Sequence, residues 1–314
     1  MRTAVTARRG FTLIEMVVAI IVLGIVGTTF GLFIVPAINA NQAVERRAAL
    51  VDSAELALRR MARDIRIALP NSVRVSYIAG TGFAIEMIPT IDGGRYCLSG
   101  DANCAGASQL LAIGSSDTDF DIVGCFHNVT FTGASFPSTA FRLIIGDSNG
   151  AVYSAAGTNA VVTPTSTSIT LSTVNGGGSG SGSCGTSSGL TPPTSYRHHI
   201  AMSAGQTFPT GSSRRRVFVI QTPVTYICNR SAGTLTRYYN YAIAATAPTP
   251  TSPPVGATSA LVTDKIDTTN LNPCIVTTLT TDVQAQGYVK LSISLANAGE
   301  TVQLNHETQL DNSQ

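Results

Sequence analysis

One carboxylate near the start of the chain lies inside a strongly apolar run. The run opens at Phe11, Glu15 is its fifth residue, and residues 16–38 that follow carry no charged side chain. A carboxylate in hydrocarbon loses its water, so its charge is costly unless another group compensates it. We therefore expect compensation from outside the isolated chain, which is typical of a subunit that associates with a neighbour.

The residues just before the run form a candidate site of peptide-bond cleavage. Arg8 and Arg9 precede Gly10, which adjoins Phe11. A secretory signal peptide is cut at small residues after its apolar segment, whereas this glycine stands before the segment. Residues 8–15 resemble the type III signal of type IV prepilins and type II secretion pseudopilins. The resemblance implies that a prepilin peptidase removes residues 1–10 as a leader and methylates the new N-terminus at Phe11.

The resemblance also implies a role in assembly for the carboxylate. Glu15 is the fifth residue after the implied cut, where the family has its glutamate. Cleavage frees an α-amino group at Phe11, and at low dielectric this cation attracts the Glu15 carboxylate of an adjacent subunit. Such a pair sets the register in which subunits stack. The alternative is an ordinary anchor whose Glu15 reaches up to the lipid headgroups.

Residues 11–38 are predicted to form a transmembrane helix that becomes the filament core. The uncharged stretch 16–38 is about 34 Å long as a helix, enough for a hydrocarbon core of about 30 Å. Arg2, Arg8 and Arg9 place the N-terminus in the cytoplasm by the positive-inside rule. We expect a single-pass protein of the bacterial inner membrane with the rest of the chain in the periplasm.

Small residues and a proline interrupt this apolar helix. Gly24, Gly27 and Gly31 allow helices to approach closely in a bundle, and Pro36 removes a backbone donor and is expected to interrupt the helix. In related filaments this zone partly unwinds on assembly, which is a hypothesis for this chain. The alternative is that these are ordinary small residues of a membrane span.

Residues 39–69 continue the helical period as an amphipathic stem. Its apolar stripe is predicted to consist of Val44, Val51, Ala54, Leu58, Met61, Ile65 and Ala68. Opposite charges at i,i+4, Glu55 with Arg59 and Arg60 with Asp64, lie on the polar side. The stripe must pack on another element, most simply on a sheet that follows it in the chain.

Residues 71–314 read as a β-rich head, so the predicted fold class is α+β. Charged residues make up only 12% of the chain, and hydroxyl residues are abundant, which fits a periplasmic sheet protein. The predicted strands are 73–78, 83–88, 122–126, 141–145, 217–224, 234–243, 288–295 and 301–305. The Gly- and Ser-rich segment 175–193 either divides the head into two sheets or is a long insertion.

All six cysteines lie beyond the apolar run, and in an oxidising periplasm an even count implies disulfides. The number of cysteines leaves many pairings open. Proximity in the sequence favours the pair Cys97–Cys104, and the pair Cys228–Cys274 would close the Pro-rich loop between them. The two cysteines that are left would form the pair Cys125–Cys184. Because no C-x-x-C motif occurs, zinc binding and thiol redox chemistry are not indicated.

The first oxygen-rich segment only partly resembles a calcium loop. Asp117, Asp119 and Asp121 have the spacing of its first ligands, but Ile122 stands where glycine is needed and Asn128 where a bidentate acid is needed. We interpret these aspartates as a polar turn that enters a strand.

A second group of possible oxygen ligands lies in one loop and consists of Asp264, Asp267, Asn270 and Asn272. This loop is either a plain turn or a calcium-binding site. His198 and His199 are adjacent, so on a strand they point to opposite faces and do not share a metal. No nucleophile motif such as G-x-S-x-G is present. We therefore expect no enzymatic activity, no catalytic residue, no metal and no cofactor.

Charge gives little support to a nucleic-acid partner. Removal of the leader with its three arginines changes the formal net charge from +2 to −1. A chain near neutrality lacks the counterion-releasing surface of a nucleic-acid binder. The local cluster 214–216 consists of three arginines ahead of a strand, where it either protects the strand edge or contributes to binding.

Parts of the head are similar to the minor pilins of mannose-sensitive haemagglutinin (MSHA) pili and to their PilW and J-type pseudopilin relatives. The similar segments are 65–74, 222–228, 235–238 and 287–307. The resemblance implies a subunit that joins other minor and major pilins at an inner-membrane assembly platform and primes or caps the pilus tip. A head of about 240 residues would crowd a filament wall but has room at a tip. The alternatives are a minor pseudopilin of type II secretion and a tip adhesin or other binding module.

Overall fold

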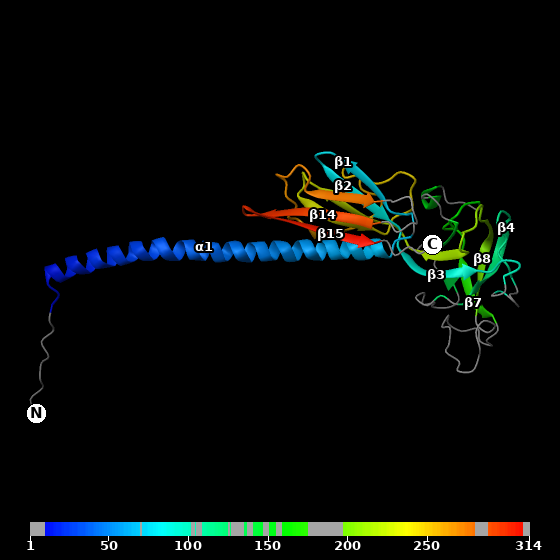
Figure 1. Cartoon of the computed structure of the whole chain (residues 1–314), viewed down its shortest axis with the longest axis horizontal. Helices are drawn as coiled ribbons and strands as arrows, with labels where there is room; N and C mark the ends of the chain where they lie inside the picture. The colour runs from blue at the N-terminus through cyan, green and yellow to red at the C-terminus, as the bar shows by residue number, and fades with distance from the viewer. Residues whose placement is uncertain are drawn as a thin grey trace, which may run out of the picture.

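One long helix and a head of β-strands make up the chain, which confirms the predicted α+β class (Figure 1). The computed structural model describes residues 10–69, 71–101, 104, 109–124, 126, 135–136, 141–146, 151–154, 159–174, 197–279 and 288–309. Helix α1 (Leu13–Arg66) has 54 residues and is therefore about 81 Å long. Its first half projects from the head, and its second half lies along strands β14 (Tyr288–Asn297) and β15 (Glu300–Gln309) (Figure 1).

The end of the stem is set by contacts with the head. The helix stops at Arg66 rather than at the predicted Leu69, because the residues after it join the sheet. The backbone N–H of Leu69 donates to the carbonyl of Ile88 at 2.7 Å, and Ala68 forms a β-bridge with Pro89.

The predicted interruption at Pro36 is wrong, because α1 continues through this residue. Proline removes one backbone donor from the helix, while the hydrogen bonds on either side remain. The protruding half of α1 is therefore one unbroken rod in the isolated chain.

Two antiparallel sheets form the part of the head next to α1, which we call the stem-proximal lobe. The first has the order β1 (Arg74–Ile78), β2 (Gly82–Met87), β10 (Val224–Asn229), β11 (Thr234–Tyr239) and β12 (Thr258–Thr263). The second has the order β13 (Cys274–Leu279), β14 and β15. Side chains of α1 and of both sheets form one buried cluster, so the stem is part of this lobe's core.

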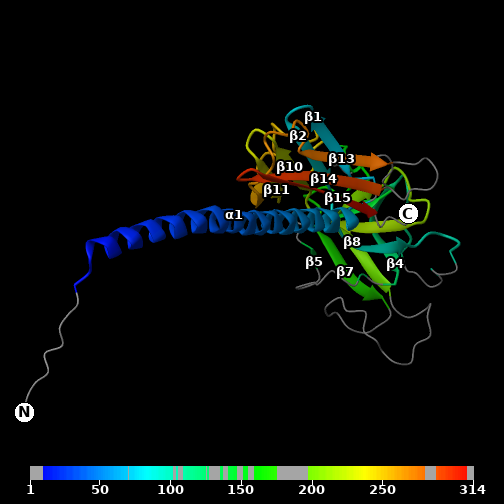
Figure 2. The ribbon, with the colours of Figure 1, turned by 60° about the vertical axis from the view of Figure 1, so that its left-hand side comes forward.

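A seven-stranded antiparallel sheet forms the distal lobe, which lies beyond the C-terminal end of α1 in Figure 1. Its order is β5 (Ser135–Phe136), β7 (Ile169–Val174), β8 (Arg197–Thr207), β4 (Ser116–Val123), β3 (Thr90–Tyr96), β9 (Arg216–Ile220) and β6 (Arg142–Ile145). In the turned view of Figure 2, its strands β5 and β7 are seen below the end of the helix. A separate aromatic-rich cluster that includes Tyr96, Phe120, Phe126 and Phe208 fills its core.

The chain passes between the two lobes twice, at 88–89 and at 221–223. The distal lobe is therefore inserted between β2 and β10. A third buried cluster, which includes Leu69, Ile88 and Ile220 together with residues of the short 3-10 helix η2 (Ala151–Tyr153), fills the junction.

The boundary between the two lobes does not lie at segment 175–193, which was one of the two possibilities predicted for that segment. The strands before and after that segment, β7 and β8, pair with one another, and Leu171 lies opposite Ile200. The segment itself lies outside the described residues. Because its flanking strands are neighbours in one sheet, it connects two strands of the distal lobe and does not divide the head.

Four predicted strands end earlier than expected. The predicted strands 83–88 and 122–126 end at Met87 of β2 and at Val123 of β4. The predicted strand 217–224 is split between β9 of the distal lobe and β10 of the other lobe, since Pro223 lacks a backbone donor for a sheet. The predicted strand 234–243 ends at Tyr239, because Asn240 has a positive φ of 59° that turns the chain.

The buried face of the stem also differs from the predicted stripe. Five residues of the predicted stripe are buried, namely Ala54, Leu58, Met61, Ile65 and Ala68. By contrast, Val44 is 67% exposed and Val51 is 37% exposed. A strict seven-residue repeat drifts around a straight helix by about 20° per repeat. Leu50 therefore replaces Val51 on the buried face.

Two of the predicted disulfides are present, and Cys125 and Cys184 lie outside the described residues. Cys97 is bonded to Cys104 in the distal lobe. Cys228 on β10 is bonded to Cys274 on β13, so this bond joins the two sheets of the stem-proximal lobe.

Replacing each bonded pair by alanines is expected to destabilise the two lobes unequally. The Cys228–Cys274 bond closes a loop with a sequence separation of 46 and the Cys97–Cys104 bond one of 7. Loop-closure entropy predicts losses of about 4 and about 2 kcal/mol respectively. Urea unfolding of the double variants, followed by tyrosine fluorescence, measures both; a larger loss for the short loop would contradict this expectation.

Candidate functional site

The predicted processing and assembly residues gather at the N-terminal tip of α1. Gly10 and Phe11 precede the helix, and the Phe11 side chain is 83% exposed. Glu15 lies in the first turn of α1. Residues 1–9, with the arginines of the predicted leader, lie outside the described residues.

Glu15 has a partner within its own chain. Its Oε2 accepts hydrogen bonds from the backbone N–H of Thr12 at 3.0 Å and from the Thr12 hydroxyl at 3.1 Å. In return the backbone N–H of Glu15 donates to the Thr12 hydroxyl at 3.4 Å. This reciprocal arrangement is a capping box, which satisfies donors that a helix start leaves unpaired.

This role of Thr12 was not predicted from the sequence, although Thr-x-x-Glu is the sequence signature of a capping box. The carboxylate is therefore partly compensated in the isolated chain. None of the described residues donates a hydrogen bond to the other oxygen, Oε1. Glu15 thus keeps an acceptor for a donor from outside the chain.

The protruding half of α1 exposes a continuous apolar surface. Every large apolar side chain from Leu13 to Ile38 is at least 43% exposed. Soluble proteins rarely expose apolar surface on this scale. By length and composition α1 also contains one stretch that is able to cross a membrane. The exposed apolar helix therefore indicates membrane anchoring.

The glycines of this helix have open space beside them. No atom outside the helix lies within 4 Å of the place where a Cβ would stand at Gly24, Gly27 or Gly31. The close helix approach predicted for these positions thus needs a partner helix from another chain, and it stays a prediction.

A buried carboxylate holds the end of the stem on the head. Asp64 of α1 accepts a hydrogen bond from the Tyr226 hydroxyl at 2.8 Å and forms an ion pair with Arg237 at 2.9 Å. These partners come from β10 and β11. Burial and the neighbouring Asp64 charge raise the pKa of Tyr226 well above its ordinary value of 10, so its hydroxyl stays a donor.

The stem's predicted ion pairs are confirmed in one case only. Glu55 and Arg59 form the predicted i,i+4 pair on the exposed side. Asp64, which was paired with Arg60 in the prediction, is instead bonded to Arg237. Asp64 is buried against the sheet, where its ion-pair partner Arg237 belongs to a strand that is distant in the sequence.

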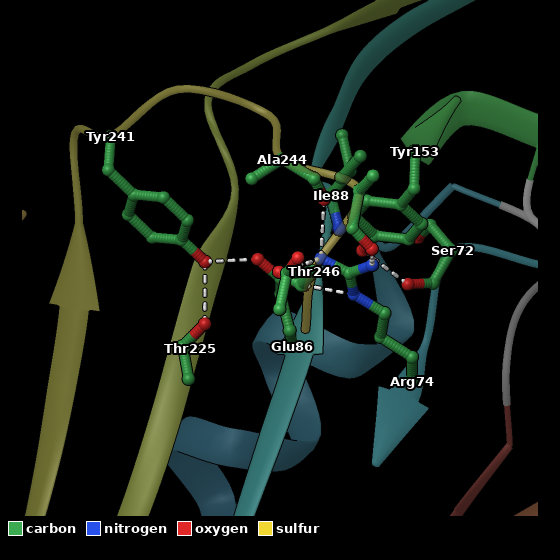
Figure 3. Close-up of polar contacts among 10 residues, drawn as sticks. Ser72, Arg74, Glu86, Ile88, Tyr153, Thr225, Tyr241, Ala244 and Thr246 are labelled. Carbon is green, nitrogen blue, oxygen red and sulfur yellow. Dashed lines mark hydrogen bonds and ion pairs between the residues drawn. The ribbon is translucent and has the colours of Figure 1, made fainter. Parts of the chain in front are cut away.

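A second buried carboxylate, Glu86 on β2, lies at the junction of the lobes (Figure 3). It forms an ion pair with Arg74 of β1 and accepts a hydrogen bond from the Tyr241 hydroxyl at 2.8 Å. The Tyr241 hydroxyl also contacts the Thr225 hydroxyl at 2.5 Å. The carboxylate therefore has a polar partner on each side.

Arg74 extends this network across the junction (Figure 3). Its guanidinium donates to the backbone carbonyls of residues 244–246 and lies 3.6 Å from the ring centroid of Tyr153 in the distal lobe. The Tyr153 hydroxyl in turn donates to the carbonyl of Ser72 at 2.6 Å. Arg74 thus links the two lobes. No pattern in the amino-acid sequence predicted this role.

Glu86 is expected to make the stability of the head depend on pH. Burial raises the pKa of Glu86 above its ordinary value of 4.5, and hydrogen bonds from Arg74 and Tyr241 oppose this only in part. The folded state therefore binds a proton at Glu86 more readily than the unfolded chain. This contribution to stability is fully present below the unfolded-state pKa and is lost as pH rises through the raised folded-state pKa.

Comparison of the wild type with Glu86→Gln isolates this contribution. The free energy of unfolding of the wild type minus that of Glu86→Gln should decrease from acid to neutral pH in urea titrations. Glu45→Gln, at an exposed position of α1, is the matched control and should show no such trend. A difference that increases with pH would mean that the ionised carboxylate is the stabilising form.

The three aspartates of the first calcium-like segment do not form the predicted turn. Strand β4 begins at Ser116, so Asp117, Asp119 and Asp121 lie inside it, and Asp121 is paired with His199 of β8. The Asp121 carboxylate is fully buried and contacts His199 Nδ1 at 2.8 Å. Sheet pairing with β8 has thus drawn these polar residues into the strand.

The two adjacent histidines have separate surroundings, as expected on a strand. His198 is buried and its Nδ1 accepts a hydrogen bond from the backbone N–H of Phe126 at 3.1 Å. His199 contacts Asp121 instead. Among the described residues there is no group of three or more His, Cys, Asp or Glu able to hold a metal ion.

The second oxygen-rich loop is organised by its own hydrogen bonds. Asp267 accepts from the backbone and hydroxyl of Thr269 at 2.9 and 2.6 Å, and from the Ser294 hydroxyl at 3.3 Å. The Asn270 side-chain oxygen accepts from the backbone N–H of Asn272 at 2.9 Å. These bonds engage oxygens that a cation would need.

The arginine cluster 214–216 is not one basic patch. Arg215 has a positive φ of 57° and forms an ion pair with Asp101, which also pairs with Arg95. Arg216 is the first residue of β9, and Arg214 is exposed. One carboxylate therefore already offsets part of the local charge.

A family model described as the prokaryotic N-terminal methylation motif matches residues 6–30. The match contains Gly10, Phe11, the capping box and the first turns of α1. The chain matches no curated protein and no solved structure. Proteins with this motif are structural, and the motif implies processing by a prepilin peptidase and assembly with pilin proteins in a membrane complex. The motif, on an apolar helix that leads into a β-rich head with two disulfides, supports a type IV pilin-like or pseudopilin protein.

Proposed function

We propose that this chain is a minor pilin of a type IV pilus of the MSHA kind, similar to MshO, that primes or caps the pilus tip. It inserts once in the inner membrane with its N-terminus in the cytoplasm and its head in the periplasm. A prepilin peptidase cuts after Gly10 and methylates Phe11. The observation that carries the proposal is the matched motif, with Glu15 at the tip of an exposed apolar helix.

Cleavage changes the electrostatics of this tip. Hydrolysis of the Gly10–Phe11 peptide bond leaves a cationic α-amino group on Phe11, next to a surface where an isolated charge is unfavourable. The Glu15 carboxylate of an adjacent subunit is the proposed partner of that amine. The unpaired oxygen Oε1 gives Glu15 the capacity to accept this donor while Thr12 holds Oε2.

The geometry of the stem leaves the apolar helix free for neighbours. Burial of α1 against the head begins at Leu50, and the first ion pair with the head joins Arg47 to Glu300. Residues 39–49 therefore separate the apolar span from the core of the head by about 16 Å. Other pilin helices have access to the whole apolar span.

The position of the distal lobe supports a place at the tip. This lobe lies beyond the C-terminal end of α1, roughly along the direction of the helix (Figure 1). In a stack of parallel stems that space is needed by the head of the next subunit. A subunit with such a lobe fits best where no further subunit follows.

Mass spectrometry of the N-terminus tests the processing step. When the chain is produced together with a prepilin peptidase, the mature protein is expected to begin at N-methylated Phe11. A mature protein that still begins at Met1 would overturn the proposal. Without the peptidase, the same chain should keep residues 1–10.

Gene deletion separates the proposed role from its alternatives. Loss of all pili is expected for a priming subunit. Intact pili that no longer adhere would favour a tip adhesin, and intact pili with a loss of protein secretion would favour a pseudopilin of type II secretion.

A further inference from the structure

A pocket of about 530 Å³ lies at the junction of the two lobes and is lined by residues of both. Three segments and the single residue Thr165 line it: the segments are 141–142 at the start of β6, the connection 221–223 between β9 and β10, and the loop 240–243 after β11. Its volume is within the range of sites that enclose a small molecule. The start of β6 belongs to the distal lobe, and the loop 240–243 belongs to the stem-proximal lobe. The pocket therefore exists only because the two lobes are packed in this arrangement.

The pocket contains one cation without a partner. Arg142 is half-buried in its lining, and no described residue forms a hydrogen bond or ion pair with the Arg142 guanidinium. Burial lowers the pKa of Arg142 from its ordinary value of 12.5, with no carboxylate to oppose the effect. By contrast, Arg74 at the same junction has Glu86 and three carbonyls. A half-buried guanidinium without a partner is suited to an anionic ligand.

The remaining lining is rich in hydroxyl and amide groups. Thr165, Gln221, Thr222 and Asn240 line the pocket and offer both donors and acceptors. Phe141 and Tyr241 add aromatic surface. The Tyr241 hydroxyl is engaged by Glu86 and Thr225, so this residue offers its ring rather than its hydroxyl (Figure 3).

We infer that this pocket binds an acidic sugar, a monosaccharide unit that carries one carboxylate. Arg142 is placed to bind the carboxylate, the hydroxyl and amide side chains to bind sugar hydroxyls, and the aromatic rings to contact the apolar face of the sugar ring.

A peptide is a poorer fit for the same pocket. A peptide that binds at a sheet adds a strand to a free edge. The outer edge of β6 is already occupied, because Ile145 donates to Val161, Thr163 donates to Leu143, and Leu143 donates to the Thr163 hydroxyl. The pocket therefore has to recognise its ligand through side chains, of which several carry hydroxyl or amide groups.

Calorimetric titration of the full-length chain in a non-ionic detergent tests this inference. The probes are galacturonate, the neutral methyl galactoside, acetate and a short peptide with a free C-terminal carboxylate. Saturable binding of galacturonate at millimolar concentration is expected, with binding at least about tenfold weaker for the methyl galactoside and for acetate.

Three variants assign the binding to the pocket. Arg142→Gln is expected to weaken galacturonate binding by about tenfold or more, since it removes the charge that the carboxylate needs. Asn240→Asp adds a carboxylate to the lining and should also weaken it, and aspartate tolerates the positive φ of 59° at this position. Arg214→Gln makes the same charge change at an exposed site on the distal lobe and should leave binding unchanged.

Thermal unfolding of each variant shows whether it is folded. If Arg142→Gln fails to fold, the nearly isosteric substitution Asn240→Asp supplies a second test. The inference is overturned if galacturonate does not bind, if the neutral sugar binds equally well, or if Arg142→Gln and Arg214→Gln behave alike. Preferential binding of the peptide would assign the pocket to a protein partner instead. All of these results are independent of whether the chain is processed or assembled into pili.

Discussion

Replacement of Glu15 by alanine is expected to leave membrane insertion and cleavage intact and to reduce recruitment of the chain into pili by about an order of magnitude or more. The apolar span 16–38 and Gly10 are unchanged in this variant, so neither insertion nor processing loses its determinant. What is lost is the proposed partner of the Phe11 amine, which would then be unpaired in a medium of low dielectric. Quantitative immunoblotting of sheared pili against the membrane fraction measures the recruitment.

Two further variants separate intermolecular pairing from helix capping. Thr12→Ala removes the capping box but keeps the Glu15 carboxylate, so recruitment should be largely retained. Glu45→Ala removes an exposed carboxylate from the same helix and should have no effect. If Thr12→Ala impaired recruitment as strongly as Glu15→Ala, the carboxylate would act only by capping its own helix, and the proposed pairing would be wrong.

Replacement of Asp64 by alanine is expected to destabilise the head by about 3 kcal/mol. The substitution removes the acceptor of Tyr226 and the counterion of Arg237, and a buried charge that loses its partner is strongly destabilising. The figure is set at the lower end for a broken buried pair because the Arg237 side chain is 18% exposed. Urea unfolding of the full-length chain, followed by tyrosine fluorescence, measures the loss.

The controls for Asp64 use the same helix. Asp64→Asn keeps an acceptor for Tyr226 but no charge for Arg237, and it should fall between the wild type and Asp64→Ala. Asp52→Ala changes an exposed aspartate of α1 and should remain within about 0.5 kcal/mol of the wild type. An Asp64→Ala variant as stable as Asp52→Ala would show that the stem does not depend on this contact.

The candidate assembly site could be predicted because its features are close in sequence. Gly10, Phe11 and Glu15 are separated by at most five positions, and helix geometry alone places Glu15 in the first turn. The apolar span is a matter of composition, and the pair Cys97–Cys104 follows from a separation of 7. Even the capping box of Thr12 was readable from a four-residue pattern.

The lobes, the buried carboxylates and the pocket depended on contacts between segments that are far apart in the chain. Asp64 and Arg237 are 173 positions apart, and Tyr241 and Glu86 are 155 apart. Whether a charged residue is solvated or buried is decided by what folds over it, and local pattern holds no information on that. Val51 was predicted to be buried and Leu50 was not, because only packing against a real sheet fixes which face of the stem is covered. The apolar helix could therefore be predicted from its own residues, whereas the interior of the head was determined by tertiary packing.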